Sequence, residues 1–127
     1  EGGRSRQTIR SVLNGKAVGS YLGRVEVARG AQQTDAEQSV KAMLLDRGAT
    51  ANCKPELEIF ADDVKCAHGA TVGELDAMQL FYAESRGLDP ASARALLLEG
   101  FVMGLWDSAK DAEAIGEAAR ETLRKVV

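Results

Sequence analysis

The sequence predicts a mainly β protein with a C-terminal α-helical part, and three observations support this fold class. Residues 1–75 contain short β-branched or alternating runs that polar and glycine-containing turns separate. After residue 75, apolar residues recur at three- and four-residue steps, which is the period of an amphipathic helix. Gly87 and the dipeptide Asp89-Pro90 add a helix-stop and a helix-start signal to this second part. We therefore divide the chain into residues 1–75 and 76–127.

Short strands are expected in the first part, at residues 8–13, 17–22, 23–27, 40–45, 57–59 and 64–66. Asn14-Gly15 is a tight-turn dipeptide between the first two. In 23–27, valines alternate with charged residues, whereas 40–45 is apolar on both faces, as in a buried strand. Residues 30–39 are polar and predict a loop. Hairpins of a β-sandwich and successive rungs of a parallel β-helix both fit such short, frequent strands.

Three helices are expected in the second part. The first, 76–86, is stopped by Gly87, and the second begins at the N-cap Asp89 with Pro90 in its first position. Its apolar stripe comprises Ala93, Leu96, Leu97, Gly100, Phe101, Gly104 and Leu105. The third helix runs from about 111 to 126, with Ala112, Ile115, Ala119, Leu123 and Val126 on one face. Phe81, Tyr82, Phe101 and Trp106 are expected to form the core of this part, with Trp106 partly exposed.

Composition limits the classes of function. The net charge of −3 argues against nucleic-acid binding, which needs a concentrated basic face. No apolar run approaches the length of about eighteen residues that a membrane helix needs. The two cysteines form no disulfide framework, so we expect reduced thiols and a cytosol-like compartment, a bacterial cytosol or a plastid. Because the chain starts without Met, we expect it to be a fragment of a longer protein.

His68 and Cys66 are the candidate metal ligands. Residues two apart in a strand share a face, so Val64, Cys66 and His68 would point the same way if the strand extends that far. Thiolate and neutral imidazole are both good iron ligands, and Gly69 would leave room beside His68. A cluster or tetrahedral metal needs about four ligands, so a partner chain or an exogenous thiol would have to complete the set.

Other interpretations of these residues stay open. Cys66 can be a small buried apolar residue and His68 a hydrogen-bonded turn residue. Cys53 is interpreted as structural. A Cys–His hydrolase is a further alternative, although nucleophile and base normally come from separate elements. The sequence has no GxxxxGK[ST] loop, so it does not bind ATP by that route.

Several blocks of the sequence resemble the SufB/SufD family of iron–sulfur cluster assembly scaffolds. They are PELEIFADDVKCAHGATVGELDAMQLFYAESRG, the upstream AQQTDAEQS and the downstream ARALLLEGF, and the resemblance spans about residues 15–105. It is closer to the SufD branch, because a SufB chain would be expected to carry glutamate at Gly69 and a cysteine within 30–39. The resemblance implies the truncated end of a right-handed parallel β-helix over 1–75 and a small helical domain over 76–127.

The resemblance also implies a function. A chain of this kind is a non-enzymatic scaffold that pairs with a SufB-like subunit through the β-helix and docks a SufC-like ATPase through the C-terminal helices. A transient iron–sulfur cluster, shared with the partner, would be held near the subunit interface. His68 matches the histidine that the family uses there, and Cys66 matches a nearby thiol. The alternative is a purely structural interaction subunit that ligates no metal.

Overall fold

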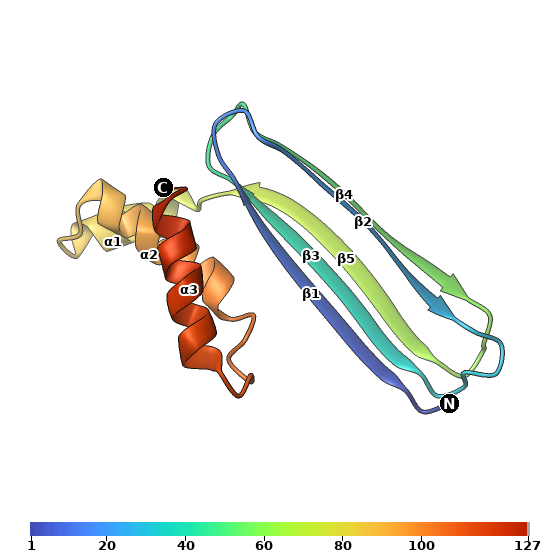
Figure 1. The fold of residues 1–127 in the computed structure, drawn as a ribbon. Helices are drawn as coiled ribbons and strands as arrows, with labels where there is room; N and C mark the ends of the chain where they lie inside the picture. The colour runs from blue at the N-terminus through green and yellow to red at the C-terminus, as the bar shows by residue number, and fades with distance from the viewer. Residues whose placement is uncertain (127) are drawn as a thin grey trace.

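The computed structural model describes residues 1–126 and contains five strands followed by three helices (Figure 1). The strands are β1 (Arg4–Leu13), β2 (Val18–Val27), β3 (Asp35–Leu44), β4 (Thr50–Ile59) and β5 (Lys65–Glu74). The helices are α1 (Ala77–Ser85), α2 (Pro90–Met103) and α3 (Ala112–Arg124). The predicted class, mainly β with C-terminal helices, is confirmed, and the element type changes where the sequence pattern changes.

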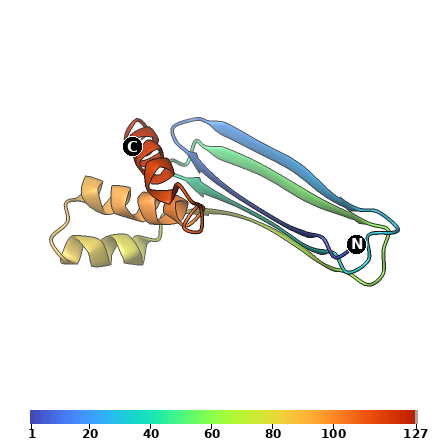
Figure 2. The same ribbon diagram turned by 60° about the horizontal axis from the view of Figure 1, so that its bottom comes forward.

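The strands form two sheets, and the chain alternates between them. One sheet has the order β1-β3-β5 and the other β2-β4, with Arg4 opposite Asp35, Asp35 opposite Lys65 and Val18 opposite Thr50. All the pairings of these five strands are parallel, so the sandwich-hairpin alternative is wrong. Figure 2 shows two long, narrow layers that turns join at both ends. The described strands form no closed sheet, so the right-handed parallel β-helix stays a prediction.

Each strand is longer than the sequence patterns predicted. The runs 17–22 and 23–27 are one strand, because Gly23 occupies an interior-facing position of β2 and does not break it. β3 begins at Asp35, inside the predicted loop 30–39. The composition of this segment is polar, but its side chains alternate as in a strand, with Ala36 and Gln38 buried and Asp35 and Glu37 exposed. β5 likewise continues through Gly69 to Glu74.

Between the sheets, Gln38 is the one polar residue that is buried among residues 1–126. Ala36, Gln38, Val40 and Ala42 of β3 are all buried, and Gln38 is only 1% exposed. Gln38 Nε2 donates hydrogen bonds to Gln7 Oε1 and to Tyr21 Oη, each 2.9 Å long. A Cβ atom at Gly23 would lie 2.2 Å from Tyr21 Oη and 2.7 Å from Gln38 Nε2, so only glycine leaves this space free.

Side-chain caps begin the first two helices, as predicted for the second. Asp76 accepts from the backbone N–H groups of Met78 and Gln79 at the start of α1. Asp89 caps α2 by accepting from the Ser92 hydroxyl and from two backbone N–H groups. These bonds, above all the one from the Ser92 hydroxyl, lower the pKa of Asp89. Gly87, with φ of +99°, ends α1 as expected.

The buried face of the helices differs from the predicted one. Ala93 of the predicted stripe is fully buried, as expected, but so is Leu98 outside it, whereas Leu96 of the stripe is 54% exposed. Phe81 and Tyr82 are 66% and 61% exposed, so the prediction that they form the core is wrong. The reason is that α1 contacts α2 through the opposite face, where Ala83 is buried. Trp106 is half-buried, as expected.

The helices lie at one end of the two sheets (Figure 1). Arg94 of α2 donates from Nη2 to the carbonyl of Leu45, just after β3, at 2.9 Å. Asn14 donates from Nδ2 to the carbonyl of Val126 at 2.6 Å. The guanidinium carbon of Arg10 lies 5.9 Å from the centroid of the Phe101 ring. The helical part is therefore attached to the sheets by polar contacts.

Substituting Leu98 by Ala should reduce the free energy of unfolding of the helical part by about 2–5 kcal/mol, because it leaves a cavity at a fully buried site. The matched control is Leu96→Ala on the same helix, expected to change stability by less than about 0.5 kcal/mol. Urea unfolding followed by circular dichroism measures both. Equal effects would contradict the observed orientation of α2.

Substituting Gly23 by Ala should reduce the free energy of unfolding by about 1–3 kcal/mol, because the new methyl group occupies the position of the Tyr21–Gln38 hydrogen bond. Gly30→Ala is the control, since a Cβ atom there meets nothing within 4 Å. Urea unfolding compares the two variants. A Gly23→Ala protein as stable as the Gly30→Ala protein would show that the interior is less tightly filled than described.

Candidate functional site

His68 and Cys66 lie on β5, the edge strand of the three-stranded sheet. β5 pairs with β3 on one side, and no other described strand pairs with its second side. Cys66 is in register with Ala36, and His68 is in register with Gln38. Because Ala36 and Gln38 face the interior, Cys66 and His68 share that face of the sheet, as the i, i+2 spacing predicts.

The two side chains differ in burial. His68 is exposed and Cys66 is half-buried. Among residues 1–126 the second sheet contains only β2 and β4, so no third strand of that sheet lies over β5. His68 lies within a strand, so the alternative that places it in a turn does not describe this chain. An exposed imidazole is available to a ligand or to another polypeptide.

Gly69 follows His68 directly in β5. As the neighbour of His68 in a strand, it lies on the opposite face of β5. A Cβ atom at Gly69 would meet nothing within 4 Å. Gly69 therefore leaves open space beside His68 on that opposite face, and the use of this space by a cluster or a partner backbone stays a prediction.

The donor atoms of the described chain are few. Both cysteines are free thiols, and Cys53 lies on β4 in register with Tyr21. Within residues 1–126, no three His, Cys, Asp or Glu side chains gather so that they could hold a metal ion. Two donors, His68 and Cys66, fall short of the usual four, so further ligands would have to come from elsewhere.

Sequence reasoning missed the residues behind His68. Gln7, Gln38 and His68 occupy successive positions of one ladder across β1, β3 and β5. The sequence signal that could have identified them is a weak repeat. Gln7-Thr8-Ile9 of β1 is similar to Gln38-Ser39-Val40 of β3, and the two segments are in register. A long, imperfect repeat of this kind identifies stacked rungs only when the strands are already aligned.

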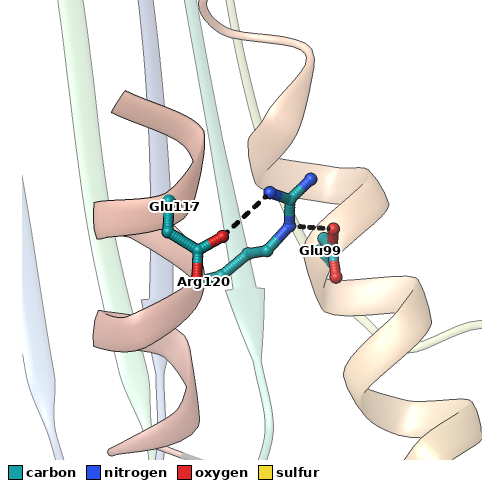
Figure 3. Close-up of polar contacts among 3 residues, drawn as sticks. All are labelled: Glu99, Glu117 and Arg120. Carbon is teal, nitrogen blue, oxygen red and sulfur yellow. Dashed lines mark hydrogen bonds and ion pairs between the residues drawn. The ribbon is translucent and has the colours of Figure 1, made fainter. Parts of the chain in front are cut away.

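The helical part contains a charged contact between two helices (Figure 3). Arg120 of α3 donates from Nε to Glu99 of α2 at 2.5 Å and from Nη1 to Glu117 at 3.4 Å. The hydrogen bond with Glu99 is the main reason that the pKa of Arg120 is raised. The adjoining hollow has a volume of about 80 Å³ and lies between α2 and α3. We interpret this contact as structural, because it joins the two helices.

Among residues 1–126, no helix combines the length and the apolar character that crossing a membrane requires.

Comparison with known proteins gives a consistent result. Residues 1–101, which include all five strands, match the family model described as SUF system FeS cluster assembly, SufBD core domain. The iron–sulfur cluster assembly protein SufD of Escherichia coli is 37% identical over 107 residues, which is 84% of this chain and 25% of that protein. The chloroplastic protein ABCI7 of Arabidopsis thaliana is 46% identical over 102 residues, 78% of this chain and 21% of that protein.

A SufBD family protein of Synechocystis is 40% identical over 105 residues, covering 83% of this chain and 23% of the relative. The chain thus spans about a quarter of the length of these curated relatives. The likeness to SufD-named proteins agrees with the resemblance found in the sequence blocks. The match over residues 1–101 and the relatives at 37–46% identity show that this chain belongs to the SufBD core-domain family of iron–sulfur cluster assembly.

Proposed function

We propose that this chain is part of a non-enzymatic scaffold on which an iron–sulfur cluster is assembled, with His68 as a ligand donor and Cys66 assisting. The observation that carries the proposal is an exposed imidazole and a half-buried thiol on one face of an edge strand. Thiolate and neutral imidazole both bind iron, and the cluster is here the cargo of the scaffold.

The partner would attach at the free edge of β5. An unpaired strand presents N–H and C=O groups to which a strand of another chain can add. Such a strand would lie about 4.8 Å from β5, so a thiolate at the register of His68 could bind the same cluster. We propose a SufB-like subunit as this partner, and the two-sheet stack as the end of a right-handed parallel β-helix.

The helices offer a second docking surface. Met78, Phe81 and Tyr82 of α1 are 73%, 66% and 61% exposed, and their i, i+3, i+4 spacing places them on one face. Exposed apolar side chains gathered in this way are typical of protein-interaction sites. We propose that α1 and its neighbours dock a SufC-like ATPase, whose nucleotide site lies outside this chain.

Competing functions are less well supported. A Cys–His hydrolase needs a nucleophile hydrogen-bonded to its base, whereas Cys66 and His68 follow each other along one strand. A purely structural interaction subunit remains the main competitor, and the substitution below distinguishes it. Two free thiols fit a reducing compartment, and we propose the bacterial cytosol or a plastid.

Replacing His68 by Ala in the full-length protein should reduce cluster assembly about tenfold or more, since it removes the exposed imidazole donor. The assay is the iron and sulfide content of the complex purified from cells that depend on it. Val72→Ala is the control, because Val72 lies on the same face of β5 and carries no donor atom.

Cys66→Ala should cause a smaller loss in the same assay. Normal clusters in the His68→Ala, Cys66→Ala double variant, together with intact complexes, would establish the purely structural alternative and remove His68 from the proposed role.

Replacing Phe81 by Glu should abolish capture of the SufC-like ATPase and leave capture of the SufB-like subunit unchanged, because it places a charge in the exposed apolar face of α1. Gln79→Glu introduces the same charge at an exposed position beside that face and should leave both captures unchanged. Affinity pull-down with the full-length protein measures both. Retained ATPase binding in Phe81→Glu would refute the assignment of α1.

A further inference from the structure

We infer that Gln38 is a positioning residue for His68: its side-chain oxygen accepts a hydrogen bond from the ring N–H of His68 and leaves the other ring nitrogen free to bind metal. The consequence for metal binding rests on the proposed function, whereas the hydrogen bond itself does not. Which of the two ring nitrogens of a histidine carries the proton is set by the hydrogen bonds that the ring makes to its neighbours.

The first observation is an unpaired oxygen in the core. Gln38 is 1% exposed, and both hydrogen bonds that it makes use Nε2, one to Gln7 and one to Tyr21. Its Oε1 atom is buried and has no hydrogen-bond partner among residues 1–126. Buried carbonyl oxygens in proteins are almost always paired, so this atom points to a donor that approaches it.

The second observation is the direction of that oxygen. Gln7, Gln38 and His68 are consecutive in one register ladder, and Nε2 of Gln38 points back toward Gln7 on β1. In a planar amide the oxygen and the nitrogen point to different sides of the carbonyl carbon, so Oε1 is directed away from β1. The neighbouring strand on that side is β5, which carries His68 at the matching position.

The third observation is proximity across the sheet. Gln38 and His68 are directly opposite each other in the register of β3 and β5, and both belong to its interior face. Neighbouring parallel strands lie about 4.8 Å apart, which a rotation of the exposed imidazole about its side-chain bonds can span. The His68 ring would then continue the ladder that begins at Gln7, with each member donating to the oxygen of the one before it.

This hydrogen bond has a defined chemical consequence. A neutral imidazole has one N–H and one lone pair, so a bond from the N–H to Gln38 fixes both the tautomer and the ring orientation. The lone pair then lies on the nitrogen that faces away from the core. If the Gln38 amide were reversed, its NH₂ would face His68, and the ring N–H would point outward, where it cannot bind metal.

The test is the tautomer of His68, read from the ring ¹⁵N chemical shifts of the full-length protein labelled at histidine. Spectra are taken at about pH 8.5, where a free imidazole is neutral. The His68 signal is identified by its loss in His68→Gln. We expect one dominant tautomer in the unchanged protein, and in Gln38→Met a shift toward the mixture that free imidazole shows.

Two further variants separate this role from general damage to the core. Gln38→Glu retains an oxygen toward His68 and should keep the tautomer. Gln7→Met makes the same amide-to-thioether change on β1, which does not adjoin β5, and should leave the tautomer of His68 unchanged. If Gln38→Met does not fold, Gln38→Asn replaces it, because its shorter side chain withdraws the oxygen and should produce the same shift.

An unchanged tautomer in the folded Gln38→Met or Gln38→Asn protein would overturn the inference. So would the opposite tautomer in the unchanged protein, with the ring nitrogen near Gln38 unprotonated. Cluster assembly measured in parallel separates the two proposals: normal assembly in His68→Ala removes the proposed function and leaves a tautomer result standing. Lost assembly in His68→Ala with an unchanged tautomer in Gln38→Met removes only the role of Gln38.

Discussion

The in-register parallel pairing of β1, β3 and β5 is the constraint on which the rest of this structure depends. In such a sheet each side chain lies beside the side chain at the equivalent position of the neighbouring strand. Polar residues at equivalent positions can therefore hydrogen-bond from one strand to the next. The ladder Gln7, Gln38, His68 results from this pairing, because three residues far apart in sequence become neighbours. The interior between the sheets is filled mainly by alanine and valine.

Local signals in the sequence were sufficient for the class of fold and for the helix boundaries. Asp89-Pro90 and Gly87 act through the chain immediately around them, so their positions could be predicted without any tertiary contact. The strand lengths could not be predicted in this way. The predicted break before Gly23 and the predicted end at Cys66 both fall within ten-residue strands whose neighbours supply the hydrogen bonds. Tertiary pairing therefore overrode local propensity.

The candidate site was predictable in its residues and not in its surroundings. Alternation along a strand was enough to place Cys66 and His68 on one face. The polar neighbour Gln38 came from a stretch that its composition assigned to a loop, and only the register shows that it lies beside His68. The exposed faces of α1 and α2 were misjudged because helical periodicity identifies an apolar stripe without showing which neighbour covers it. Phe81 belongs to such a stripe and is left uncovered by α2.

The attachment of the helices to the sheets has a mechanical consequence. The chain passes from β5 into α1 through only Leu75 and Asp76, which alone would act as a swivel. Arg94 adds a second anchor at the carbonyl after β3, and Asn14 adds a third at Val126. Together with the linker, these contacts restrain the helices, so a force on the helices is transmitted to the end of the central strand β3 as well as to the edge strand β5. Both hydrogen bonds end on backbone oxygens, and the contact of Arg10 with the Phe101 ring adds a further link, so all three have to break before the helical part can turn about the linker.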